Sequence, residues 1–166
     1  MIPRYRILQE RIEAELAELD RAVLKAVRAY EQAQRDEQQS TFFLDSVAIN
    51  LHSYYNGVER IFEWIGREID GVVPSGPAWH RELLTQMTLE AEVVRPAVLR
   101  RETAAALEPY LRFRHLVRNL YTWSFESDKL GRLVADLTPT FAALEVDLTA
   151  FGRFLEAASS ADEAPD

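Results

Sequence analysis

The sequence predicts an all-α protein, an antiparallel helical bundle of four main helices plus one or two short helices. Three observations lead to this fold class. Apolar residues recur at steps of three and four positions over long stretches, which places them on one face of a helix. No stretch alternates apolar and polar residues as a half-buried strand does. The chain also lacks an internal repeat with a period of about twenty to fifty residues, which excludes a solenoid.

The first two helices have the longest regular patterns. The first spans about Arg4 to Gln38, with charged side chains between its apolar positions. The second begins at Ser40 or Thr41, either of which can cap a helix, and ends at Gly71. The apolar positions are Ile7, Leu8, Ile12, Leu16, Leu19, Val23, Val27 and Tyr30 in the first helix, and Phe43, Val47, Leu51, Tyr54, Val58, Ile61 and Ile65 in the second. Both helices are therefore amphipathic.

Glycine and proline interrupt the middle of the chain. Residues 72–77, VVPSGP, predict a loop, and a shorter helix follows from about Ala78 to Leu89. Pro96 and Pro109 bracket a piece that is either a short helix or a turn. A strongly apolar helix then starts at Pro109, because proline is well suited to the first turn of a helix. We expect this helix to be the most buried.

The last helix is predicted from Ser127 to about Ala158. Residues 159–166, SSADEAPD, are polar and acidic and predict a disordered tail. Residues 1–158 are then one helical-bundle domain, as expected for a chain of 166 residues.

The composition narrows the possible functions. There is no cysteine, which excludes disulfides, thiolate catalysis and cysteine-ligated metal sites. The net charge of −8 argues against a protein that coats nucleic acid non-specifically, although an acidic protein can still have a basic patch. No stretch has the character of a signal peptide or the length of a membrane span. We therefore expect a cytoplasmic protein with no membrane partner, no metal and no cofactor.

Positive charge is concentrated in one region, between Arg95 and Arg118. Its arginines are Arg95, Arg100, Arg101, Arg112, Arg114 and Arg118. Within it, the run YLRFRHLVRNLYTW mixes polar residues into an apolar helix. Arg114, Arg118 and Tyr121 fall on one helical face, and His115 and Asn119 fall on the adjoining face.

Two interpretations of these polar residues are equally consistent with their spacing. Guanidinium groups could hold a phosphodiester through its non-bridging oxygens, with an imidazole available for proton transfer. Alternatively, the arginines could form ion pairs with acidic residues of the first or last helix.

Other polar residues have simpler interpretations. Asp45, His52 and Glu59 are seven residues apart, so successive members lie about 10.5 Å apart along a helix, too far to share one metal ion. We interpret them as a polar seam facing a loop, solvent or a partner chain. His80, beside Trp79, is interpreted as a helix-start or packing residue rather than a catalyst.

Several segments in order resemble the HepT-like branch of the HEPN superfamily. They are the second helix, LDSVAINLHSYYNGVERIFEWIGREIDG, the loop and helix VPSGPAWHRELLTQM, the phrase RPAVL and the helix YLRFRHLVRNLY. The resemblance covers most of the chain and implies the toxin of a toxin–antitoxin pair. It implies a metal-independent endoribonuclease in which two copies of an Arg-x4-6-His motif face each other across a homodimer cleft. The implied partner is a minimal nucleotidyltransferase antitoxin that silences the toxin by adenylylating a tyrosine.

Carried onto this chain, the resemblance places the motif arginine at Arg114 and the modified tyrosine at Tyr121, but it places the motif histidine at Asn119. An amide cannot transfer a proton near neutral pH. His115, one helical turn earlier, is the residue that could replace it. The implied catalytic residues are therefore Arg114, His115, Arg118 and Asn119, and the implied RNA-binding residues are Arg112, Arg114 and Arg118.

Three functional hypotheses follow. The first is an endoribonuclease toxin, weakened by the asparagine, in which the 2′-hydroxyl of RNA attacks the adjacent phosphodiester. The second is a non-catalytic HEPN interaction module that keeps the homodimer and the contact with a nucleotidyltransferase. The third, a generic structural bundle, requires the resemblance over several segments to be accidental.

Overall fold

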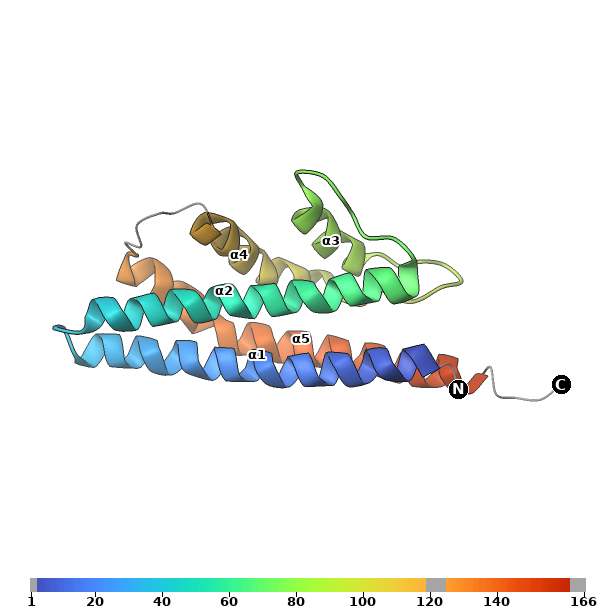
Figure 1. The fold of residues 1–166 in the computed structure, drawn as a ribbon, viewed down its shortest axis with the longest axis horizontal. Coiled ribbons are helices and arrows are strands. Elements are labelled where there is room, and N and C mark those ends of the chain that lie inside the picture. The colour runs from blue at the N-terminus through green and yellow to red at the C-terminus, as the bar shows by residue number, and fades with distance from the viewer. Residues whose placement is uncertain (1–2, 119–124, 162–166) are drawn as a thin grey trace.

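The fold is an all-α helical bundle, as predicted, in a computed structural model that describes residues 3–118 and 125–161. The helices, in order, are α1 (Pro3–Arg35), α2 (Ser40–Ile65), α3 (Trp79–Thr88), α4 (Arg101–Arg118) and α5 (Ser127–Ala161), and a π-helical turn, Gly66–Asp70, prolongs α2. The successive long helices α1, α2, α4 and α5 reverse direction (Figure 1). Among the described residues, none of these helices is long and apolar enough to cross a membrane.

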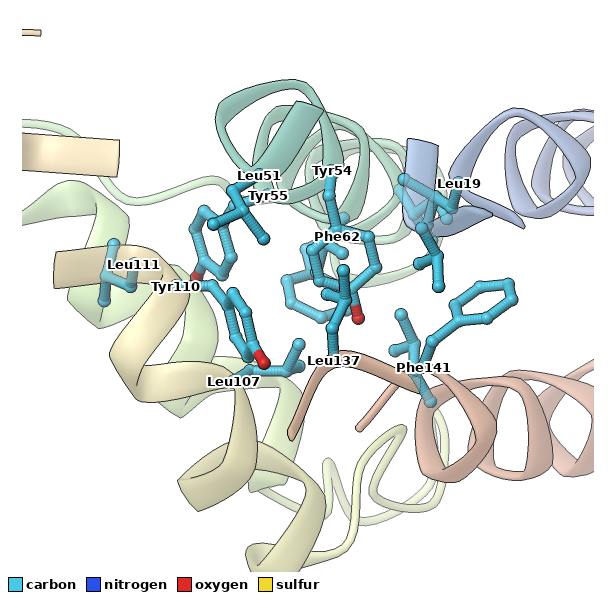
Figure 2. Packing of buried hydrophobic residues seen from close by; sticks show 14 of the residues in the cluster. Leu19, Leu51, Tyr54, Tyr55, Phe62, Leu107, Tyr110, Leu111, Leu137 and Phe141 are labelled. Carbon is cyan, nitrogen blue, oxygen red and sulfur yellow. The ribbon is translucent and has the colours of Figure 1, made fainter. Parts of the chain in front are cut away.

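The helices form two groups around α2. Helices α1 and α5 run beside α2 along the long axis, while α3 and the beginning of α4 lie together on another side of α2 (Figure 1). The core lies where α1, α2, α4 and α5 converge, and Figure 2 shows Leu19, Tyr54, Phe62, Tyr110 and Phe141 meeting there. The rings of Tyr54 and Tyr110 pack edge to face with their centroids 5.5 Å apart. Burying each such side chain contributes about 1.5–3 kcal/mol, so this layer holds the four long helices together.

Helices α1 and α2 approach each other closely at Gly57. A Cβ atom at this position would lie 2.5 Å from Leu19 Cδ2 and 2.7 Å from Glu15 Oε1, closer than van der Waals contact. The same crossing carries an ion pair between Arg60 and Glu15, with Nη1 and Oε1 2.8 Å apart. The absence of a side chain at Gly57 therefore sets the separation of the helical hairpin.

The end of α2 follows the sequence prediction and also fixes the connection to α4. Gly71 has a φ of +70°, the left-handed conformation that ends a helix. Just before it, Asp70 Oδ1 accepts a hydrogen bond of 2.5 Å from Nε of Arg95. The Arg95 side chain is buried, so this arginine belongs to a structural ion pair and not to a cationic surface. Arg100 pairs with Asp147 of α5, with Nε and Oδ1 2.6 Å apart, although its own side chain is 57% exposed.

The predicted start of α4 was wrong. Helix α4 begins at Arg101, so Pro109 lies inside it rather than at its start. The backbone N–H and guanidinium of Arg100 both donate to the carboxylate of Asp147, which anchors the start of α4 on α5. This tertiary contact outweighs the loss of one helical hydrogen bond at the proline. Helix α5 continues to Ala161, beyond the predicted end at Ala158, and Ser159 is buried.

Candidate functional site

The site is centred on Arg114, which lies on α4 where this helix faces α2 and α3. Its side chain is 13% exposed and three of its nitrogens have partners on the other two helices. Nε donates to Asn56 Oδ1 at 2.6 Å, and Nη2 lies 3.2 Å from Glu59 Oε1. Nη1 lies 3.3 Å from Nε2 of His80. Asn56 and Glu59 are three residues apart on α2, so both face α4 and together fix the plane of the guanidinium.

His80 is held from its other side by the same carboxylate. Nδ1 of His80 lies 2.6 Å from Glu59 Oε2. Because a carboxylate only accepts hydrogen bonds, Nδ1 is the donor, and Nε2 is then the nitrogen that accepts from Arg114 in the neutral imidazole. The ring of Trp79 packs against the imidazole, with the two centroids 3.6 Å apart. Hydrogen bonding and ring contact thus fix both the position and the tautomer of His80.

This arrangement corrects one of the sequence interpretations and extends another. Glu59 is 3% exposed and forms the centre of the cluster, so it does not belong to a polar seam facing solvent. His80 has an acidic partner and is more than a helix-start residue. The signal was present in the sequence: Glu59 has Tyr55 and Phe62 as its neighbours on the helical face, and both are fully buried. A carboxylate on the buried face of a helix requires a cationic or hydrogen-bonding partner.

Arg114 and His80 open onto a pocket of about 420 Å³ between the start of α3 and the second half of α4. The lining residues are Pro77, Ala78, His80, Arg81, Leu111, Arg112, Arg114, His115 and Leu116. The residues described as lining it include three arginines and two histidines but no aspartate or glutamate. A nearby carboxylate, Glu108, pairs with Arg81 and lies 3.8 Å from Arg112. The pocket is therefore a cationic recess with one apolar side, suited to an anionic group attached to an organic one.

Tyr55 lies behind this cluster on α2, and its ring is completely buried. Burial, reinforced by the negative charges of Glu59 and Glu108, raises the pKa of Tyr55 well above its ordinary value. The phenol therefore stays protonated and uncharged next to the charged groups of the cluster. Across residues 3–118 and 125–161, no three side chains of the metal-binding types are grouped to hold a metal ion.

The structure brings together three of the residues predicted from the sequence. Arg112, Arg114 and His115 all line the pocket, and Arg112 and His115 are exposed. Arg118 is the last residue of α4, and its side chain lies outside the described part of the structure. Asn119 and Tyr121 also lie outside the described residues. The ion-pairing interpretation is correct for Arg114, but the carboxylate comes from α2 and not from the first or last helix.

Comparison with known proteins assigns the chain to a family. No curated protein and no solved structure matches the chain. Residues 46–155 match the sequence model of a family described as HepT-like protein. The matched region is more than half of the chain and contains every residue of the cluster around Arg114. The chain therefore belongs to the HepT-like protein family, the branch of the HEPN superfamily that its sequence resembles.

Proposed function

We propose that this HepT-like protein is a cytoplasmic, metal-independent endoribonuclease, the toxin of a toxin–antitoxin pair. The observation that supports this proposal is the cationic pocket, in which a rigidly held Arg114 is surrounded by Arg81, Arg112 and His115. Arginine is the side chain best suited to a phosphodiester, because its planar donors match two phosphate oxygens. The apolar side of the pocket, formed by Leu111 and Leu116, suits a base or ribose.

The reaction that fits these residues is transesterification within the RNA strand. The 2′-hydroxyl attacks the adjacent phosphorus and the bond to the 5′ oxygen breaks, which leaves a 2′,3′-cyclic phosphate and a 5′-hydroxyl. Arg114 and Arg118 stabilise the extra negative charge that the phosphorane carries. His115, from the exposed edge of α4, transfers a proton in place of the asparagine at the motif position. Asn119 orients a water molecule or the substrate.

The working form of the site is a homodimer. Leu116 lines the mouth of the pocket and is 53% exposed although it is apolar. A second copy packed about a two-fold axis would bury this side chain and bring two pockets together into one groove. Light scattering at micromolar concentration should give the mass of two chains, and replacing Leu116 with Glu should give one. A parent protein that is monomeric under these conditions would refute the proposal that two chains form one site.

The direct test is cleavage of a labelled, mixed-sequence single-stranded RNA in the presence of a chelator. Products should end in a 2′,3′-cyclic phosphate, and the same strand with 2′-deoxyribose should stay intact because it lacks the nucleophile. Arg112→Ala tests phosphate binding without disturbing the fold, since this side chain is 69% exposed and its ion pair with Glu108 is long, at 3.8 Å. The slope of log affinity against log salt should fall by about 0.7 for one lost contact to a single strand. Arg60→Ala, which removes an exposed arginine paired with Glu15, is the matched control and should leave the slope unchanged. If both variants bind RNA like the parent, Arg112 does not contact phosphate.

A second candidate function is a non-catalytic module that binds a minimal nucleotidyltransferase antitoxin. Two features favour it: an asparagine at the motif histidine position, and the engagement of Arg114 by Glu59, Asn56 and His80. Co-expression with a minimal nucleotidyltransferase, followed by mass spectrometry, would distinguish the two. A stable complex and AMP on Tyr121, combined with a parent protein that leaves RNA intact, would support the module over the nuclease.

A further inference from the structure

The imidazole of His80 has the environment of a positioned base, although it lies on a different helix from the HEPN motif. We infer that His80, held by Glu59, accepts the proton of the RNA 2′-hydroxyl and is the base that works alongside His115. This inference rests on the endoribonuclease function proposed above. Three observations support it. Nδ1 of His80 forms a 2.6 Å hydrogen bond with Glu59, Nε2 lies 3.3 Å from Arg114 Nη1, and the side chain lines the pocket.

The hydrogen bond to Glu59 determines which nitrogen can react. With Nδ1 donating to the carboxylate, the lone pair of the neutral ring is on Nε2, the nitrogen nearer Arg114. The carboxylate also stabilises the imidazolium that forms when Nε2 takes a proton, the role that a buried carboxylate has beside the histidine of a catalytic triad. Glu59 is therefore a positioning residue, and His80 is the group that meets the substrate.

Arg114 places the phosphate beside this base. In this structure the Nη1 group of Arg114 donates to Nε2 of His80. A phosphate oxygen is a charged acceptor and forms a stronger hydrogen bond with a guanidinium than a neutral imidazole does. Phosphate binding to Arg114 would therefore release the lone pair of Nε2 next to the bound phosphodiester. The 2′-hydroxyl that attacks this phosphorus belongs to the adjoining ribose, within reach of the released nitrogen.

The two histidines of the pocket then have different parts in the reaction. Nε2 of His80 takes the proton from the 2′-oxygen while that oxygen forms its bond to phosphorus. The bond from phosphorus to the 5′ oxygen breaks, and this oxygen takes a proton from protonated His115, which comes from α4 rather than α3. One proton is accepted and one is donated, and exchange with water restores both rings after product release. His80 is 13% exposed and its orientation is fixed by Glu59, so it is better prepared than the exposed His115 to act as the base.

The test compares single histidine variants of the full chain on the labelled RNA described above. His80→Gln should lower the rate of cleavage by about a hundred- to ten-thousand-fold, the usual contribution of general acid–base catalysis. Affinity for the uncleavable 2′-deoxy strand should stay within about threefold, because Arg114 keeps its contacts with Asn56 and Glu59. His52→Gln is the matched control, since His52 lies on α2 and is not among the pocket residues. It should cleave RNA like the parent.

A chemical rescue separates catalysis from a purely structural role. Added imidazole should restore part of the activity of His80→Ala, because the small base can occupy the space left beside Glu59, and should not affect His52→Ala. Loss of strand binding and of thermal stability in His80→Ala, without rescue, would show a structural residue and overturn the inference. An active parent whose His80→Gln variant cleaves like His52→Gln would overturn it as well, while leaving the endoribonuclease function intact. A parent that binds RNA but never cleaves it would instead refute the proposed function, and this inference with it.

Discussion

The stability of the site can be tested by replacing Glu59 with glutamine, a change of charge with almost no change of shape. Glu59 is 3% exposed, accepts a hydrogen bond from His80 at 2.6 Å and forms an ion pair with Arg114, whose Nη2 lies 3.2 Å from Oε1. The amide removes the negative charge and presents an NH2 group to one of these two donors. Losing one charge-assisted hydrogen bond costs about 1.5–3 kcal/mol, and leaving Arg114 without its counter-charge adds to this. We expect a total loss of about 2–4 kcal/mol in the free energy of unfolding.

Urea unfolding followed by circular dichroism measures this loss directly, and thermal unfolding should show a fall in Tm of roughly 5–15 °C for a domain of this size. Glu63→Gln is the matched control, one helical turn further along α2. Glu63 pairs with Arg67 at 2.7 Å, but the arginine is 61% exposed, so the pair contributes less than about 1 kcal/mol. If the two variants differ in stability by less than about 0.5 kcal/mol, Glu59 is solvated in solution and our account of the buried cluster is wrong.

Two further predictions concern the core. Burial raises the pKa of Tyr54, Tyr55 and Tyr110 above the ordinary value of 10.0, so the unfolded chain releases these protons first and stability should fall as pH rises above about 10. A titration of tyrosinate absorbance should show these three rings ionising only together with loss of helical circular dichroism, and ionisation before unfolding would contradict it. Gly57→Ala should destabilise the hairpin by about 1–3 kcal/mol in urea unfolding, because its Cβ would overlap Leu19, whereas Gly71→Ser meets no neighbouring atom and should lose only the cost of its left-handed backbone. Equal stability of Gly57→Ala and the parent would mean that α1 and α2 move apart freely.

The sequence was sufficient for the fold because helical periodicity is a local property. The end of α2 at Gly71 and the short helix α3 were both predicted from spacing and turn residues, and the structure confirms them. The start of α4 was misplaced because the local signal of Pro109 opposed a contact between Arg100 and Asp147, which are 47 residues apart in the chain. Local sequence patterns cannot predict a contact between residues so far apart in the chain.

The residues of the site also fall into two groups, those that could be predicted from local spacing and those that could not. Arg112, Arg114 and His115 lie within one helical turn, so their spacing alone placed them in one site. Glu59 and His80 could not be assigned in this manner, because their partners are chosen by the packing of α2, α3 and α4 against one another. What the sequence does contain is a carboxylate on a buried face. That feature indicates that a partner exists, although it does not identify the partner.

The placement of α3 explains how a histidine outside the motif can be held accurately. This helix has only ten residues, too few to be stable alone in water, so its position must come from contacts at its ends. At its start, His80 binds Glu59, and near its end, Gln86 donates to Asp70 at 2.6 Å while Arg95 donates to the carbonyl of Gln86. Both carboxylates belong to the continuous stretch formed by α2 and its π-helical turn. The imidazole of His80 and the guanidinium of Arg114 are therefore both held by this single continuous element, which fixes side chains from three helices relative to one another, as the proposed reaction requires.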